Sequence, residues 1–139
     1  MTHLDEIVET FELLDDWDQR YEYLVELGEQ LPEMPDYLKT EENRVKACMS
    51  KVWISMQKED GGIQIQGDCD TSVIKGVLAL LISLCQGETS ANIQQIDMDE
   101  IFQRLNLDDH LSPNRHVGVY AMFELMKQKA ADAEAAHAA

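Results

Sequence analysis

The spacing of apolar residues changes at Lys51, and this change constrains the fold more than any other feature of the chain. Residues 52–57 alternate between apolar and mostly polar side chains, the two-residue period of a half-buried strand. A Glu-Asp-Gly-Gly turn follows at 59–62, and residues 63–66 alternate again. An antiparallel β-hairpin is therefore predicted over about residues 51–67.

Segments with helical spacing surround this hairpin. The segment from about Ser72 to Cys85 is apolar on nearly every side, which is typical of a central helix packed on a sheet. The other predicted helices begin near Leu4, at Asp16, at Asp97 and at Ser112-Pro113, with a short helical turn after Thr89. The fold class is predicted to be α+β, a small antiparallel sheet packed against several helices.

The chain length predicts a single domain. At 139 residues the chain is long enough for a core without disulfides or metals. Residues 1–129 are assigned to this domain. The alanine-rich segment 130–139 is low in complexity and is predicted to fray.

The composition excludes several classes of function. A formal net charge of −16 argues against binding to nucleic acids and to anionic membranes, which both need a basic surface. The longest apolar run, residues 77–82, is too short to span a bilayer. Three cysteines without a C-x-x-C pair are no disulfide framework, and the first residues are acidic where a targeting segment is basic. A cytoplasmic protein with reduced thiols is expected.

Cys48 is the most promising reactive group. Four of the eleven basic residues, Arg44, Lys46, Lys51 and Lys58, lie within ten positions of it in an otherwise acidic chain. Nearby positive charge favours a thiolate, which is the nucleophilic form of cysteine. The alternative interpretation is a packing cysteine, the commoner role of free cysteines.

Cys69 is expected to lie near Cys48. It ends the second predicted strand, and Cys48 precedes the first, so hairpin pairing brings the two segments together. A metal or iron–sulfur scaffold built on Cys48, Cys69 and Asp70 is therefore an alternative function, although the spacing matches no strong ligand pattern. Cys85 lies on the apolar helix and is assigned to the core. His110 and His116 are candidates for proton transfer, although solvated loop histidines are commoner.

Four segments in a fixed order resemble the SufE family, the sulfur-accepting partners of cysteine desulfurases in iron–sulfur cluster assembly. The resemblance runs from about Leu13 to Lys127. It is based on Asp16–Gly28 with Leu31-Pro32, on Val45, Cys48, Ser50, Val52 and Trp53, on Gly67–Asp70 with Ile74-Lys75-Gly76, and on Leu111–Arg115 with Gly118.

The resemblance implies a function and a fold. Cys48 would be the sole essential nucleophile, taking sulfur as a persulfide from a desulfurase of the SufS or CsdA type and thereby stimulating it. The sulfur would then pass to an iron–sulfur scaffold. The pyridoxal phosphate belongs to the desulfurase, so this chain would need no cofactor or metal and would be a carrier and not an enzyme. The implied fold is shared with IscU-type scaffolds.

The resemblance also implies supporting residues. Arg115 would stabilise the thiolate or persulfide, Asp70 would hold the cysteine loop closed, and Ser50 and Lys51 belong to the cysteine motif. Two departures from the family pattern concern the site. Ala47 replaces a glycine, and Cys69 replaces a serine, which introduces a possible second thiol. A third interpretation is an acidic interaction module without thiol chemistry.

Overall fold

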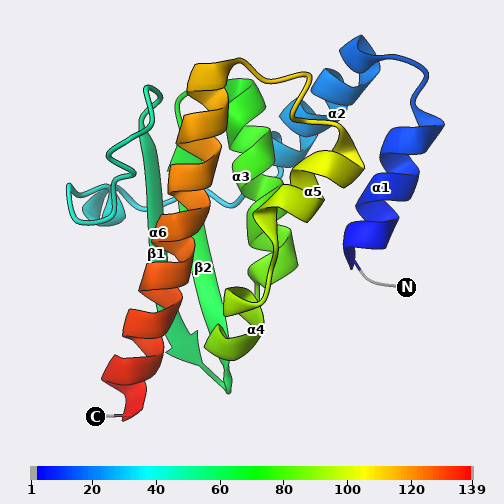
Figure 1. Ribbon diagram of the computed structural model, residues 1–139. Coiled ribbons are helices and arrows are strands. Elements are labelled where there is room, and N and C mark those ends of the chain that lie inside the picture. Colours follow the sequence, from blue (N-terminus) through cyan, green and yellow to red (C-terminus); the bar gives the residue numbers. More distant parts are fainter. Residues whose placement is uncertain (1–2, 139) are drawn as a thin grey trace.

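The computed structural model describes residues 3–138 and has the predicted α+β architecture. A two-stranded antiparallel sheet lies against helices from both halves of the chain (Figure 1). The elements are α1 (His3–Leu13), α2 (Trp17–Glu29), the 3-10 helix η1 (Asp36–Leu38), β1 (Val52–Glu59), β2 (Gly62–Cys69), α3 (Ser72–Cys85), α4 (Ser90–Gln94), α5 (Met98–Leu105) and α6 (Pro113–Ala138).

The two-residue turn at Asp60 and Gly61 sets which residues of β1 and β2 pair in the hairpin. The pairs run from Glu59 with Gly62 beside the turn to Val52 with Cys69 at the open end. Asp60 and Gly61 both have positive φ, 51° and 83°, as a two-residue turn of type I′ requires. Helix α3 packs on β2 and helix α6 packs on β1, so the open end of the hairpin meets the start of both helices.

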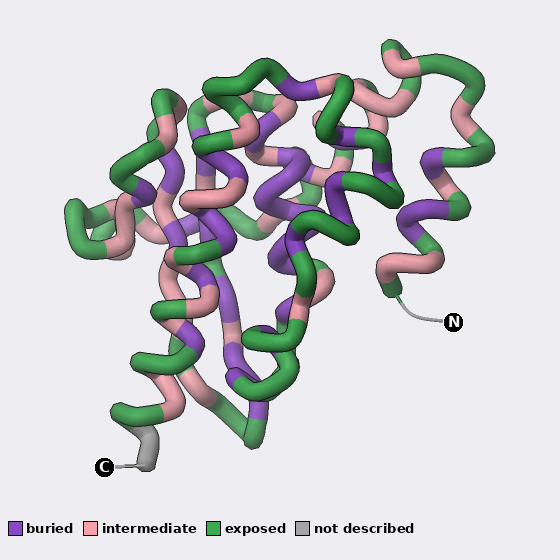
Figure 2. Tube along the Cα trace, in the orientation of Figure 1, coloured by how far each residue is buried: buried purple, intermediate pink, exposed green. Residues whose placement is uncertain are grey.

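Helix α3 is the centre of the core. Nine of its residues are buried, which explains the all-round apolar composition seen in the sequence (Figure 2). Its neighbour α2 approaches closely at a pair of glycines. A Cβ added at Gly76 would lie 2.0 Å from the Leu24 carbonyl oxygen, and one added at Gly28 would lie 3.0 Å from the Gly76 nitrogen. The two helices therefore pack backbone against backbone.

The predicted starts of α2 and α5 are confirmed by their caps. The Asp16 carboxylate accepts the Gln19 N–H at 2.9 Å, and Asp97 accepts those of Asp99 and Glu100. Thr71 precedes α3 but makes no such cap, because its hydroxyl is engaged with Ser50 and Asp70. The start of α3 is thus tied to the segment before β1.

Residues 130–138, part of the segment predicted to fray, continue α6 in the structure. Ala130 is fully buried, and Glu134 forms an ion pair with Lys58 at 2.8 Å. Alanine is also the residue that most favours a helix, so composition and packing act together. Residue 139 lies outside the described residues. Within the described range, no helix has both the length and the apolar character that crossing a membrane would require.

The Gly76→Ala substitution is expected to destabilise the protein by about 3 kcal/mol, because the new methyl group meets rigid helix backbone. Gly118→Ala is the matched control, since there the nearest atoms belong to Cys48, a loop residue. Urea denaturation of both variants measures the difference. Equal stability of the two variants would contradict the close packing of α2 on α3.

Candidate functional site

A cleft of about 230 Å³ opens beside Cys48, where the open end of the hairpin meets the starts of α3 and α6. Its lining includes a thiol, that of Cys48. Its lining comes from three separate parts of the chain: Cys48, Met49 and Ser50; Thr71 and Ile74; Ser112, Asn114 and Arg115.

The loop that carries Cys48, residues 46–51, is held by hydrogen bonds that continue beyond the paired strands. Past the last strand pair, the Lys51 N–H donates to the Asp70 carboxylate at 2.9 Å, and the Asp70 N–H donates to the Lys51 carbonyl at 3.1 Å. One step further, the hydroxyls of Ser50 and Thr71 lie 2.7 Å apart. Three of the predicted supporting residues, Asp70, Ser50 and Lys51, therefore belong to one hydrogen-bonded network. This network, which also includes Thr71, is called the latch below. Lys51 takes part through its backbone.

The thiol of Cys48 lies against the backbone of α6. A Cβ added at Gly118 would lie 2.8 Å from the Cys48 sulfur, so only glycine leaves room for this position. Cys48 is half-buried, whereas its neighbour Met49 is 83% exposed. The loop thus turns the sulfur inward and the methionine outward. Local sequence patterns did not single out Gly118, which entered only through the family resemblance.

Arg115 lines the cleft from the first turn of α6. Its backbone N–H donates to the Ser112 hydroxyl at 3.3 Å, which fixes the start of the helix. Within residues 3–138, no carboxylate forms an ion pair with its guanidinium group. A cation without an acidic partner therefore lines the same small cleft as the Cys48 thiol.

Three of the four basic residues near Cys48 in sequence form ion pairs, and none of the four is among the residues that line the cleft. Arg44 and Lys46 both pair with Glu41, at 3.7 and 2.7 Å. Lys58 lies at the turn end of β1 and pairs with Glu134. The basic residue among those that line the cleft with Cys48 is Arg115, which is distant in sequence and which no local pattern could reveal.

Cys69 is buried at the end of β2. Its sulfur accepts the Thr71 N–H at 3.5 Å. Burial raises the pKa of the Cys69 thiol to about 11, and negative charge on Asp70, Cys48 and Asp68 adds to the increase. The thiol is therefore protonated at neutral pH, close to the cleft but shielded from solvent.

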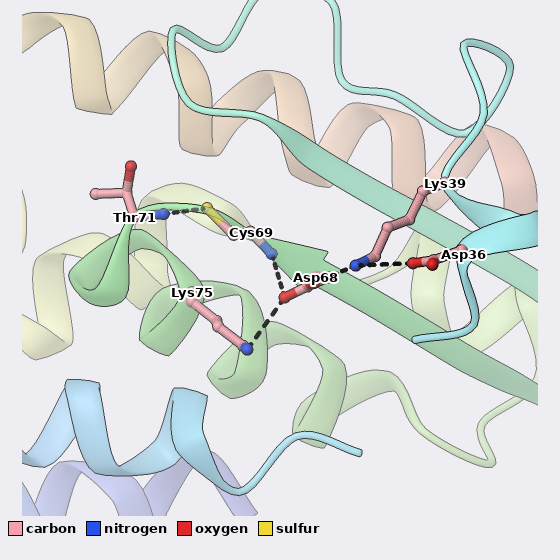
Figure 3. A network of polar contacts seen from close by, with 6 residues as sticks. All are labelled: Asp36, Lys39, Asp68, Cys69, Thr71 and Lys75. Carbon is pink, nitrogen blue, oxygen red and sulfur yellow. Dashed lines mark hydrogen bonds and ion pairs between the residues drawn. The ribbon is translucent and has the colours of Figure 1, made fainter. Parts of the chain in front are cut away.

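Asp68 fixes the end of β2 by contacts with two lysines and with the backbone of Cys69 (Figure 3). Its carboxylate pairs with Lys39 at 3.0 Å and with Lys75 at 3.1 Å, and accepts the Cys69 N–H at 2.8 Å. Burial alone would raise the pKa of Asp68, but the hydrogen bonds from the two lysines outweigh it and lower the pKa. Sequence reasoning missed both lysine partners, because their contacts join separate elements.

The two candidate histidines are engaged elsewhere. The His110 ring stacks on Trp17 with centroids 3.8 Å apart, and the His116 ring packs edge-on against Phe102. In the part of the chain that the structure describes, no group of three His, Cys, Asp or Glu side chains is placed to hold a metal ion. The alternative ligand set of Cys48, Cys69 and Asp70 is thus not assembled here.

Comparisons with known proteins agree with this architecture. Residues 5–130 match the model of the SufE family, described as an Fe-S metabolism associated domain. The chain is 37% identical to an uncharacterized SufE-like protein of Rhizobium meliloti over 134 residues, which is 94% of this chain and 96% of that protein. It is 34% identical to another from Rhizobium etli, covering 94% and 90%.

A solved structure shares the fold. It is the solution structure of a hypothetical protein from Thermus thermophilus, with a TM-score of 0.79 and 19% sequence identity, covering 95% of this chain and 96% of that one. The family match ties the chain to Fe–S metabolism and supports a role in sulfur transfer.

The Gly118→Ala variant is expected to alkylate faster at Cys48 than the wild type, by about threefold or more, because the added methyl group displaces the sulfur toward solvent. Peptide mapping after limited iodoacetamide treatment measures the rate at each cysteine. Cys85, buried in α3, is the internal control and keeps its slow rate. An unchanged Cys48 rate would contradict the contact with α6.

The buried thiols should make the protein lose stability in alkali. Burial raises the pKa of Cys85 to about 12 from its ordinary 9.0. Below pH 9.0 this thiol is protonated in both states. Between 9.0 and about 12 only the unfolded state releases the proton, so stability falls as pH rises. Cys85 alone contributes about 1.4 kcal/mol per pH unit.

Urea denaturation across this pH range measures the slope, and Cys85→Ala is expected to reduce it. The matched variant Cys69→Ala should remove a contribution that ends near pH 11. The same slope in all three proteins would contradict the burial of these thiols as the cause.

Proposed function

The chain belongs to the SufE family, and we propose that it accepts sulfur from a pyridoxal-phosphate-dependent cysteine desulfurase onto Cys48, stimulates that enzyme and passes the sulfur to an iron–sulfur scaffold. The observation that supports this most directly is the shared cleft of Cys48 and Arg115. A thiol and an arginine whose guanidinium group has no acidic partner in the described structure line the same space.

The proposed transfer is a thiol–persulfide exchange. The Cys48 thiolate attacks the terminal sulfur of the persulfide on the desulfurase, and the partner's cysteine leaves as a thiolate. One sulfur–sulfur bond forms as another breaks, so no oxidant or reductant is needed. Clearing this sulfur frees the desulfurase for its next turnover, which is the basis of the proposed stimulation.

Arg115 is proposed to stabilise the charge that Cys48 carries before and after transfer. A thiolate and a persulfide anion are both negative at their terminal sulfur, and a guanidinium offers several N–H donors in one plane. The otherwise strongly acidic chain supplies few other cations to this cleft, since Lys46 and Arg44 are paired with Glu41.

The latch is proposed to position the thiol. Asp70 holds both backbone groups of Lys51, and Ser50 contacts Thr71, so the loop on which Cys48 lies is fixed at its C-terminal side. The role proposed for these residues is to hold the backbone of the loop in place. Asp70 thus sets the resting position of Cys48 against Gly118.

The pyridoxal phosphate is assigned to the partner, and no resident cofactor or metal is assigned to this chain. In this proposal the protein is a carrier and an activator, not an enzyme. Because a persulfide survives only where competing oxidation is limited, we assign this function to the cytoplasm, where cysteines remain reduced. All three cysteines are free in the structure.

Cys48→Ser is expected to abolish sulfur acceptance and the stimulation of the cognate desulfurase. Arg115→Gln is expected to slow transfer about tenfold or more, because a hydrogen bond to a charged group is worth about 1.5–3 kcal/mol. Alanine production from free cysteine measures desulfurase turnover. Cys85→Ala, altered in the core far from the cleft, is the matched control and should stimulate like the wild type.

Full stimulation by Cys48→Ser would refute the proposed function. If both Arg115→Gln and Arg115→Ala transferred sulfur at the normal rate, the proposed role of the guanidinium group would be refuted. The proposed role of the Cys48 thiol would still stand. Arg115→Lys tests the geometry, since it keeps the charge and loses the planar donors.

A further inference from the structure

A second thiol lies next to the Cys48 loop and has no part in the transfer described above. Cys69, the last residue of β2, is only 6% exposed and belongs to the central hydrophobic cluster. Cys48 is half-buried and packs against that same cluster. Both sulfur-bearing side chains therefore lie at the open end of the hairpin.

Thr71 joins the surroundings of the two sulfurs. Its side chain lines the cleft with Cys48, and its backbone N–H donates to the Cys69 sulfur at 3.5 Å. The latch holds these segments in register, since Ser50 contacts Thr71 and Lys51 pairs with Asp70. Charge on Cys48 also contributes to the raised pKa of Cys69, as expected for neighbouring groups.

We propose that Cys69 is a resolving thiol, which discharges the Cys48 persulfide when no acceptor takes its sulfur. This inference rests on the proposed function, because it needs a persulfide on Cys48. It assigns the protein a further activity, the release of hydrosulfide from stored sulfane sulfur, with a Cys48–Cys69 disulfide as the second product.

The step balances without an outside reagent. Cys69 loses its proton and attacks the persulfide sulfur that is bonded to the Cys48 carbon. A sulfur–sulfur bond forms between the two cysteines, the bond to the terminal sulfur breaks, and that sulfur leaves with the proton as hydrosulfide. The terminal sulfur is reduced and the Cys69 sulfur is oxidised, while the Cys48 sulfur keeps the oxidation state that it has in the persulfide.

The step requires the Cys48 loop to move toward Cys69. A disulfide joins Cα atoms usually 4.4–6.8 Å apart. Residues 46–49 lie outside both strands and precede the latch, so this part of the loop can move toward Cys69 while the latch and the hairpin keep their register. A dithiol reductant would reopen the disulfide and restore both thiols.

The surroundings of Cys69 make this discharge slow. Burial keeps its thiol protonated at neutral pH, and the carboxylates of Asp68 and Asp70 oppose its ionisation. Arg115 is the nearby cation of the cleft but is not among the groups that act on Cys69. Transfer of sulfur to a docked acceptor is therefore faster than attack by Cys69. Cys69 attacks the Cys48 persulfide only when no acceptor has taken its sulfur.

The test first forms the persulfide on Cys48 in two separate arms. One arm uses a desulfurase with free cysteine, and the other uses inorganic polysulfide. After removal of the donor, intact mass measurement follows the added sulfur, and hydrosulfide is measured in parallel. In the wild type we expect first-order loss independent of protein concentration, one hydrosulfide per persulfide, and a peptide linking Cys48 to Cys69 before reduction.

Cys69→Ser and Cys69→Ala are expected to hold the persulfide at least about fivefold longer, since only intermolecular attack remains. Cys85→Ala is the matched control and should lose sulfur like the wild type. It removes a buried thiol at the far end of α3, about 20 Å along the helix from Thr71. A purely structural Cys69 would give the opposite result, because loosening the loop exposes the persulfide and shortens its lifetime.

Equal persulfide lifetimes in the wild type and both Cys69 variants, without the linked peptide, would overturn this inference and leave the proposed function standing. Failure of the desulfurase arm to load Cys48, with loading by polysulfide, would refute the proposed function instead. The polysulfide arm then still decides whether Cys69 resolves the persulfide.

Discussion

The site depends on one pairing, the two hydrogen bonds between Lys51 and Asp70 just beyond the last strand pair. A hairpin normally releases its two chains at the open end. Here the carboxylate of Asp70 replaces the missing strand partner and keeps the segments together for two more residues, up to Ser50 and Thr71. The segment that follows Cys48 is therefore tied to the end of β2, and the resting position of Cys48 depends on the register of the sheet.

Helix α6 completes the site from the other side. Gly118 leaves room for the Cys48 sulfur, and Arg115 brings a positive charge to the cleft one turn earlier. The Ser112 cap fixes where the helix begins and therefore which residues face the loop. Because α6 packs along β1 as far as the Lys58–Glu134 ion pair, the helix cannot shift without disturbing the hairpin.

The parts predictable from sequence are those encoded by local patterns. The two-residue period and the Gly-rich turn specify the hairpin, and the apolar run from Ser72 to Cys85 specifies α3 with the observed ends. The family resemblance pointed to Cys48, Arg115 and Asp70, which the structure brings to one end of the hairpin.

Tertiary contacts explain what sequence reasoning missed. The basic residues around Cys48 suggested a cluster, but Glu41 and Glu134 pair with three of them, and no local pattern encodes such partners. The burial of Ala130 against the core is also not encoded in the alanine-rich composition of its segment. The contact of Gly118 with the Cys48 sulfur likewise requires the whole fold.

The central claim is that Cys48 receives sulfur from a desulfurase, and the most direct measurement is peptide mapping by mass spectrometry after incubation with the desulfurase, pyridoxal phosphate and free cysteine. The account predicts one added sulfur atom on the Cys48 peptide, which disappears on reduction. An unmodified Cys48 peptide, recovered beside a desulfurase that is turning over and carries persulfide on its own cysteine, would contradict the account.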